Sequence, residues 1–232
     1  MKVKNLCIIP ARGGSKRIPR KNIKYFKGEP IISYSIRAAI ESGLFDEVMV
    51  STDDIEIKDI AKSYGASVPF LRSEETSNDF ANTANVLIEV SNVYQSLGKE
   101  YTNICCIYPT APFITTGRLI EGFEILSQGA DSVLPILSFD YPIWRSFKVN
   151  ENDNLVYNWV EFVDSRSQDL PKSYHDAGQW YWVKIDRLKE SGKLIFETSK
   201  GLQLLPFEAH DIDTLHDWKL AELKYEYLQS IK

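Results

Sequence analysis

One short segment, Pro10–Asn22, combines glycines with cationic side chains, the residue types that bind phosphate groups. It reads P-A-R-G-G-S-K-R-I-P-R-K-N. Gly13 and Gly14 let the backbone approach a ligand closely, and successive backbone N–H groups can surround phosphate oxygens. Arginine grips phosphate with two donors, whereas lysine acts as a point charge. The spacing is neither Walker A nor G-x-G-x-x-G. The segment therefore predicts a phosphate site of another kind, with a solvated basic loop as the alternative.

A second candidate site consists of two carboxylates, Asp211 and Asp213. In an extended segment, side chains two residues apart point to the same face. Mg²⁺ typically binds one or two protein carboxylates together with substrate phosphates. The pair therefore forms an oxygen-rich site that suits Mg²⁺. A short D-x-D is also common in exposed loops, and Asp213 could instead cap a helix that begins near Leu215.

The composition is that of an ordinary globular protein, with 232 residues, 44% hydrophobic and 25% charged. The net charge of −5 argues against general nucleic-acid binding, yet seven basic residues and no acidic one lie between Arg12 and Lys27. This local excess indicates a confined anion site. Cys7, Cys105 and Cys106 lie in apolar runs and predict reduced core thiols of a cytosolic protein. Neither a signal peptide nor a membrane span is predicted.

Apolar strands alternate with helices over the first two thirds of the chain. This rhythm predicts an α/β fold, a three-layer α/β/α arrangement around a mostly parallel, Rossmann-like sheet. Ligands of such sheets bind beyond the carboxyl ends of the strands, where the Gly-rich segment falls. The predicted strands are Val3–Ile9, Glu47–Ser51, Ala66–Pro69, Asn103–Tyr108, Ser132–Pro135, Gln179–Ile185 and Leu202–Pro206. The predicted helices are Pro30–Glu41, Asp54–Tyr64, Asn82–Leu97, Thr115–Ser127 and Thr214–Gln229.

The alternation breaks in residues 139–176, where aromatic residues, Asn and Asp accumulate. We predict a nucleotide-binding catalytic domain formed by residues 1–138 and 177–232, and an inserted dimerisation arm formed by residues 139–176. Aromatic side chains are enriched at subunit contacts, so the arm predicts a homodimer. Packing of these rings on their own domain is the alternative. The aromatic residues considered are Tyr141, Trp144, Phe147, Tyr157, Trp159 and Phe162.

Sequence blocks over nearly the whole chain resemble those of the acylneuraminate cytidylyltransferases. The Gly-rich segment matches the family signature A-R-G-G-S-K-x-I-P-x-K-N. Further blocks match the S-T-D, R-x-x-E, P-T-[SA]-P and D-I-D elements in the same order. They are Ser51–Asp53, Leu71–Ser77, Pro109–Pro112 and Asp211–Thr214, the last followed by Asp217 and Trp218. The stretch Tyr174–Trp182 looks most like the pseudaminic acid branch. The resemblance implies a fold like that of the nucleotide-diphospho-sugar transferases.

The resemblance also implies a role for each matched residue. Asp211 and Asp213 would hold Mg²⁺ or another divalent cation. The implied catalytic residues are Arg12, Lys16, Lys21 and Arg166. The implied nucleotide-binding residues are Ala11, Arg12, Gly13, Gly14, Ser15, Lys16, Asn22, Arg72 and Asp79. The implied sugar-binding residues are Tyr108, Thr110, His175, Gln179 and Tyr181. For His175, Gln179 and Tyr181 a purely structural role is the alternative.

The implied reaction transfers CMP from CTP to the anomeric hydroxyl of a nine-carbon sugar acid and releases pyrophosphate. Sialic acid members usually carry Gln before the P-T-[SA]-P turn, whereas this chain has Tyr108. The difference favours pseudaminic or legionaminic acid over N-acetylneuraminic acid. Enzymes for 3-deoxy-octulosonic acid usually lack G-G-S-K, which disfavours that substrate. Two other classes remain open, a glycosyltransferase with a D-x-D metal site and a non-catalytic nucleotide-binding module. No nucleic-acid or membrane partner is expected, and the sequence identifies no general base.

Overall fold

A seven-stranded sheet forms the centre of the computed structural model, which describes residues 3–78 and 81–231. The strand order is β11-β6-β10-β5-β1-β4, and β9 pairs with β6. The sheet strands are β1 (Asn5–Pro10), β4 (Glu47–Ser51), β5 (Asn103–Ile107), β6 (Ser132–Ser138), β9 (Tyr174–Asp176), β10 (Trp180–Lys184) and β11 (Lys200–Gln203). Two small hairpins are formed by β2 (Tyr25–Phe26) with β3 (Glu29–Pro30) and by β7 (Phe147–Val149) with β8 (Leu155–Tyr157).

Strand directions confirm the predicted α/β fold with a mostly parallel sheet. β1 is parallel to both β4 and β5, and β11 is parallel to β6. β10 runs antiparallel between β5 and β6, so β11, β6, β5, β1 and β4 share one direction. β9 is antiparallel to β6. The carboxyl ends of the five parallel strands therefore lie at one edge of the sheet, and the loops that follow β1, β4 and β5 gather there.

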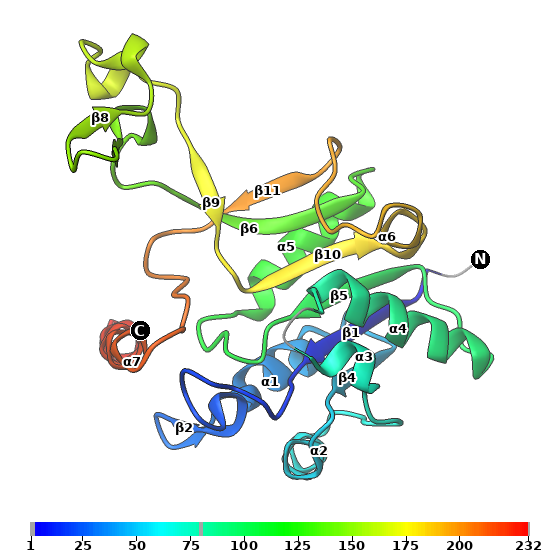
Figure 1. Ribbon diagram of the computed structural model, residues 1–232. Helices are drawn as coiled ribbons and strands as arrows, with labels where there is room; N and C mark the ends of the chain where they lie inside the picture. The colour runs from blue at the N-terminus through cyan, green and yellow to red at the C-terminus, as the bar shows by residue number, and fades with distance from the viewer. Residues whose placement is uncertain (1–2, 79–80, 232) are drawn as a thin grey trace.

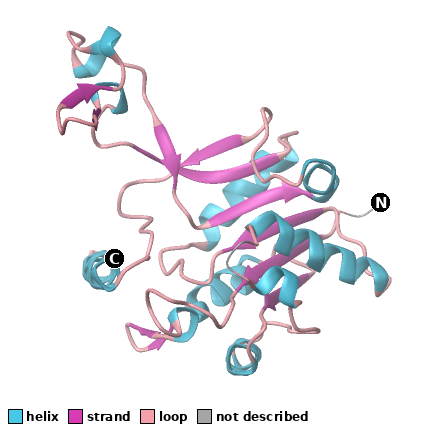
Figure 2. Ribbon diagram, viewed as in Figure 1, coloured by secondary structure: helices cyan, strands magenta, loops and turns pink. Residues whose placement is uncertain are grey.

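Helices cover both faces of the sheet, as Figures 1 and 2 show. They are α1 (Ile32–Ser42), α2 (Ile55–Ser63), α3 (Glu74–Ser77), α4 (Thr83–Ser96), α5 (Thr116–Ser127), α6 (Ile185–Ser191) and α7 (Leu215–Ser230). Successive side chains of a strand point to opposite faces. In β1, Cys7 and Ile9 join a core with α1, α2 and α5, whereas Leu6 and Ile8 join a core with α4 and α6. The result is the predicted three-layer arrangement.

The starts of two helices are fixed by side-chain caps. The Asp54 carboxylate accepts a hydrogen bond from the Ile57 N–H at the start of α2. At the start of α7 the cap is Thr214, which forms a capping box with Asp217. Asp213 is therefore not the helix cap that the sequence allowed as an alternative, and its carboxylate is directed to other partners.

The structure differs from the predicted elements in several places. Residues 66–69 do not form a strand, because the chain touches the sheet at one bridge only, between Ser67 and Met49. Helix α6 was not predicted, because seven residues are too few for helical periodicity to stand out. Among the residues that the structure describes, no helix is long and apolar enough to span a bilayer.

Residues 139–173 project away from the sheet as an arm (Figure 1). The rings of the arm pack on one another. Trp144 lies 5.3 Å from Trp159, and Phe147 lies 4.5 Å from Tyr157, measured between ring centroids. The last three residues of the segment predicted as the arm form β9, which pairs with β6 of the main sheet.

Candidate active site

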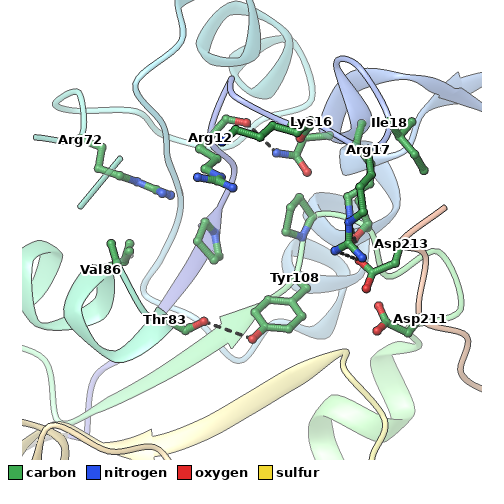
Figure 3. Close-up of a pocket in the computed structure, with 17 residues that line it drawn as sticks. Arg12, Lys16, Arg17, Ile18, Arg72, Thr83, Val86, Tyr108, Asp211 and Asp213 are labelled. Atoms are coloured by element: carbon green, nitrogen blue, oxygen red, sulfur yellow. Dashed lines mark hydrogen bonds and ion pairs between the residues drawn. The ribbon is translucent and has the colours of Figure 1, made fainter. Parts of the chain in front are cut away.

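A cavity of about 580 Å³ opens at the carboxyl edge of the sheet, beside the ends of β1 and β5. In Figure 3, Arg12 and Arg72 lie on one side, Asp211 and Asp213 on the other, and Tyr108 between them. The lining residues are Pro10, Arg12, Ser15, Lys16, Arg17, Ile18, Lys21, Asn22, Arg72, Ala81, Thr83, Val86, Tyr108, Pro109, Thr110, Asp211 and Asp213. The tertiary structure thus brings the Gly-rich segment and the two aspartates to one cavity.

Hydrogen bonds to the backbone shape the Gly-rich loop after β1. The Gly13 N–H donates to Asp53 Oδ1 at 2.9 Å, and the Asn22 side-chain amide donates to the Arg12 carbonyl at 2.9 Å. A methyl group on Gly13 would lie 2.7 Å from Asp54 Oδ2, closer than packed atoms approach. A side chain at residue 13 would therefore displace either the loop or Asp54 in the segment that follows β4.

Arg20 fastens the same loop to the start of α2. Its φ of 56° lies in the left-handed region that few non-glycine residues occupy. Its two terminal nitrogens lie 2.5 and 3.0 Å from the two carboxylate oxygens of Asp54, and it also pairs with Glu56. The guanidinium of Arg20 lowers the pKa of Asp54. A two-point pair of this kind fixes orientation as well as distance, so it holds the loop in one direction.

Arg72 brings a buried positive charge to the cavity wall. The residue is only 9% exposed. Its Nε donates to the Ser51 hydroxyl at 3.1 Å, and its Nη2 donates to the Ser51 carbonyl at 2.5 Å. Burial lowers the pKa of the guanidinium, but arginine remains protonated in proteins. Because these hydrogen-bond acceptors are neutral, they orient the charge without neutralising it.

Asp213 is contacted by two cations of the Gly-rich segment. Arg17 Nη2 lies 2.7 Å from Asp213 Oδ1, and Lys21 Nζ lies 3.6 Å from the same oxygen. Lys21 also donates to the Ile212 carbonyl at 2.8 Å. Asp211 lines the same cavity. These contacts hold the segment before α7 against a loop that lies far away in the sequence.

The donor set at the aspartates fits one kind of metal ion. Among the described residues, no group of three or more His, Cys, Asp or Glu side chains could hold a metal. A structural zinc site needs four protein ligands, which Asp211 and Asp213 do not supply. Mg²⁺ needs only one or two carboxylates when phosphates and water complete its shell. The pair therefore fits a divalent cation that binds together with a nucleotide.

Tyr108 is held in the cavity wall at both its backbone and its side chain. Its N–H donates to the Gln179 carbonyl at 2.8 Å, and its carbonyl accepts from the Ser35 hydroxyl at 2.7 Å. Its own hydroxyl shares a hydrogen bond of 3.1 Å with Thr83, the first residue of α4. Burial raises the pKa of the phenol. Tyr108 therefore presents a neutral hydroxyl of fixed position beside the cavity.

Comparison with known proteins identifies the family. A sequence model described as Cytidylyltransferase matches residues 6–154. The chain belongs to the cytidylyltransferase family. The pseudaminic acid cytidylyltransferase of Campylobacter jejuni is 44% identical over an alignment of 232 positions, which covers 97% of each chain. The CMP-N,N'-diacetyllegionaminic acid synthase of Legionella pneumophila is 33% identical over 228 residues, again 97% of each chain. This cytidylyltransferase is therefore a nucleotidyltransferase.

The fold of the cytidylyltransferase is shared with a solved structure of low sequence identity. CMP:2-keto-3-deoxy-manno-octonic acid synthetase, solved in complex with CTP, superimposes with a TM-score of 0.70 and 17% identity. The match covers 98% of this chain and 99% of that one. It supports the three-layer architecture and the mostly parallel sheet.

Most of the residues predicted for the site line the cavity of the cytidylyltransferase. They are Arg12, Ser15, Lys16, Lys21, Asn22, Arg72, Tyr108, Thr110, Asp211 and Asp213. The other predicted loop residues, Ala11, Gly13 and Gly14, belong to the same loop but are not part of the lining, and Ala11 is buried. Asp79 lies outside the described residues.

Arg166 and His175 lie away from the cavity within one chain. Arg166 is on the arm, with its side chain 78% exposed and its Nε 3.7 Å from Asp169 Oδ2. His175 is on β9, where its ring lies 5.0 Å from the Phe139 ring. Neither residue lines the cavity of its own chain, and their assigned roles stay predictions.

Gln179 and Tyr181 are buried behind the cavity rather than in it. The Gln179 amide donates to the Glu208 carbonyl at 2.5 Å, and Gln179 is 3% exposed. Tyr181 is 6% exposed and packs behind Tyr108. Their burial favours the structural role that the sequence allowed as the alternative, and β10 lies inside the sheet between β5 and β6. Direct sugar contact by these two side chains stays a prediction.

Arg17, Arg20 and Thr83 make polar contacts in or beside the cavity but were not among the predicted site residues. Arg17 and Arg20 occupy the two variable positions of the family signature, so the resemblance offered no signal beyond their charge. Thr83 lies 25 residues before Tyr108, and only the packing of α4 beside β5 brings the two hydroxyls together. A general base is not identified by the geometry either.

Proposed function

We propose that this cytidylyltransferase transfers CMP from CTP to the anomeric hydroxyl of a nine-carbon sugar acid, with pseudaminic acid as the preferred acceptor. Pyrophosphate is the second product, and the CMP-sugar is an activated donor for surface glycan biosynthesis. One observation carries the proposal: the Gly-rich basic loop and the Asp211–Asp213 pair line a single cavity. The acceptor follows the relative that is 44% identical over 97% of both chains.

The triphosphate of CTP is assigned to the basic side of the cavity. Arg12 and Lys16 bind phosphate oxygens, and Lys21 stabilises the charge that develops at the α-phosphate as the anomeric oxygen attacks. Transfers of this kind depend chiefly on positioning and on charge stabilisation. Arg72 supports the assignment, since it adds a buried positive charge to the same wall.

Asp211 and Asp213 are assigned to hold Mg²⁺ or another divalent cation. Such an ion, when bound, neutralises phosphate charge and assists departure of pyrophosphate. Both carboxylates line the cavity that the basic loop also lines, which supports the assignment. Removal of divalent ions by EDTA should reduce pyrophosphate release to background, and added Mg²⁺ should restore it. Full activity in EDTA would contradict a metal requirement.

The sugar acid is assigned to the part of the cavity around Tyr108 and Thr110. A tyrosine there is larger than the glutamine of the sialic acid members and offers a hydroxyl instead of an amide. This difference supports an acceptor other than N-acetylneuraminic acid. The same reaction on legionaminic acid is the second candidate, because a legionaminic acid synthase is 33% identical over almost the full chain.

A homodimer would give the arm and Arg166 a function. The arm projects away from the main sheet of its own chain (Figure 1), and the Arg166 side chain on it is 78% exposed. We assign residues 1–138 and 177–232 to the catalytic domain and residues 139–176 to an arm that contacts a second copy. Arg166 would then reach the partner's cavity, where a guanidinium suits the acceptor carboxylate. Sedimentation velocity at micromolar concentration should give the mass of a dimer, and a monomer would reject this assembly.

A panel of free nonulosonic acids, each incubated with CTP and Mg²⁺, tests the reaction directly. Pyrophosphate release should be fastest with pseudaminic acid and slower with legionaminic and N-acetylneuraminic acid. Absence of release with every acid would overturn the proposal. A glycosyltransferase would instead consume a pre-formed nucleotide sugar, and a binding module would release nothing.

We propose the cytosol as the compartment, because the cysteines are buried free thiols, as is usual in reducing compartments.

A further inference from the structure

A line of contacts leads from Tyr108 away from the cavity. The Tyr108 ring meets the Tyr181 ring edge-on, with centroids 5.5 Å apart and an interplanar angle of 62°. The Tyr181 hydroxyl donates to Asp176 Oδ2 at 2.6 Å. Tyr181 is almost fully buried, whereas Asp176 is exposed. An exposed carboxylate is thus linked to the cavity wall through one buried tyrosine.

The second oxygen of Asp176 holds a turn that lies beside Asp211. Asp176 Oδ1 accepts from the Gly178 N–H at 2.8 Å. Gly178 has a φ of 64°, and a Cβ built on it would lie 3.9 Å from Asp211 Cγ. Asp176 therefore anchors two features at once, the tyrosine behind Tyr108 and the turn beside Asp211.

Asp176 fixes which group is the donor in its hydrogen bond with Tyr181. An ionised carboxylate only accepts hydrogen bonds, so the Tyr181 hydroxyl must be the donor. Burial raises the pKa of Tyr181, as do the neighbouring Tyr108 hydroxyl and the Asp176 carboxylate, so the phenol stays protonated. A phenol offers one donor and two acceptor sites. The hydrogen bond with Thr83 uses one of these sites on Tyr108, which leaves capacity for a ligand in the cavity.

We propose that Asp176 and Tyr181 are positioning residues that hold the Tyr108 hydroxyl against the sugar acid and so set acceptor specificity. Tyr108 is the residue that touches the acceptor, at a hydroxyl or an acylamido group. The Tyr108 ring packs against the Tyr181 ring, so a change in the position of Tyr181 would shift Tyr108. The inference rests on the proposed function and extends it from the cavity wall to residues behind the wall.

Tyr181→Phe removes the hydroxyl that Asp176 holds and keeps the ring. We expect it to raise KM for the sugar acid about two- to tenfold, the effect of one lost hydrogen bond, and to leave KM for CTP within about twofold. Asp176→Asn keeps an acceptor oxygen and should lose less than Asp176→Ala. The Tyr181→Phe and Asp176→Ala double variant should be no worse than the poorer single variant, because the two residues act as one unit.

Tyr94→Phe is the matched control. Tyr94 is also a buried tyrosine that donates to a carboxylate at 2.6 Å, here Glu47 Oε1, but neither residue lines the cavity. This variant should lower the melting temperature and leave both KM values unchanged. Equal shifts of KM for CTP and sugar acid in Tyr181→Phe, additive losses in the double variant, or an unchanged KM for the acid would overturn the proposal. Failure of the proposed function is distinguishable, because the wild type would then release no pyrophosphate with any acid.

Discussion

At the scale of single residues, the cavity is divided between cations and carboxylates. Lys16 lines it on the basic side and Asp211 on the acidic side. The proposed transfer requires both, since one binds phosphate oxygens and the other holds the divalent cation. Neither side chain belongs to a hydrophobic core of the described structure, so their removal should not unfold the protein.

Lys16→Ala and Asp211→Ala should each lower kcat for pyrophosphate release by about a hundredfold or more, the range found when one charge-stabilising group is removed. Circular dichroism and the melting temperature should stay close to wild type. Near-wild-type kinetics in either purified variant would contradict the assigned roles.

The ion pair of Arg17 with Asp213 places a cation on a carboxylate that is also assigned to the metal. The pair is 2.7 Å long, and the Arg17 side chain is 65% exposed. Arg17→Ala should strengthen Mn²⁺ binding in the absence of nucleotide, because it removes a cation that competes with the metal for Asp213. The gain should be only about two- to fivefold, because exposed ion pairs contribute little free energy. Titration of Mn²⁺ followed by electron paramagnetic resonance measures this directly. Arg187→Ala, which breaks the pairs of Arg187 with Asp131 and Glu190 outside the cavity, is the control. Weaker Mn²⁺ binding in Arg17→Ala would show that Arg17 does not compete with the metal.

At the scale of elements, the loop after β1 takes its shape from the segment after β4. Asp53 accepts from the Gly13 N–H, and Asp54 both caps α2 and pairs with Arg20. The loop after β1, the segment after β4 and the start of α2 therefore meet at Asp53 and Asp54. The S-T-D block is thus explained as a support for the Gly-rich loop.

Gly13→Ala tests this support. Its methyl group would meet Asp54 Oδ2 at 2.7 Å, so either the loop or the aspartate must move. We expect affinity for CTP to fall about tenfold or more, because misplaced binding groups lose much of their effect. Isothermal titration calorimetry with CTP measures it. Gly14→Ala meets no atom within 4 Å and should lose less. Equal losses in both variants would show that the close contact with Asp54 is unimportant.

At the scale of the whole molecule, Glu47 joins the edge strand β4 to the helix layer. Burial disfavours its ionised form, but hydrogen bonds outweigh burial and lower the pKa of Glu47 to about 2. The donors are Lys99, Tyr94, Ser67 and Tyr101. The carboxylate therefore stabilises the fold while it is ionised.

Glu47→Gln should lower the free energy of unfolding by roughly 1–3 kcal/mol at pH 7. The folded pKa of Glu47 is depressed, so its stabilisation is fully present above its unfolded pKa of about 4.5. It is lost as the pH falls towards about 2, and the difference between wild type and variant should shrink over that window. Urea unfolding at pH 7, 4 and 3 measures it. A difference that does not change with pH would mean that Glu47 ionisation does not stabilise the fold.

Much of the fold could be predicted because periodicity is a local property. Strand β4 was predicted at its observed bounds, and α4 and α5 within one residue at each end. The missed features depend on contacts that no local pattern encodes. Helix α6 has too few residues to show a periodic pattern. Residues 66–69 form only the bridge between Ser67 and Met49, because that segment lies beside β4 over a short distance.

By itself the sequence determined which residue types could perform the chemistry, since glycines, cations and paired aspartates carry their properties wherever they lie. The tertiary structure alone decided which of them meet. It placed Asp213 beside Arg17 although 196 residues separate them, and it placed Gln179 and Tyr181 behind the cavity instead of in it. The physical reason is that the position of a side chain relative to a cavity depends on strand order and packing, and adjacent strands such as β10 and β5 are distant in sequence.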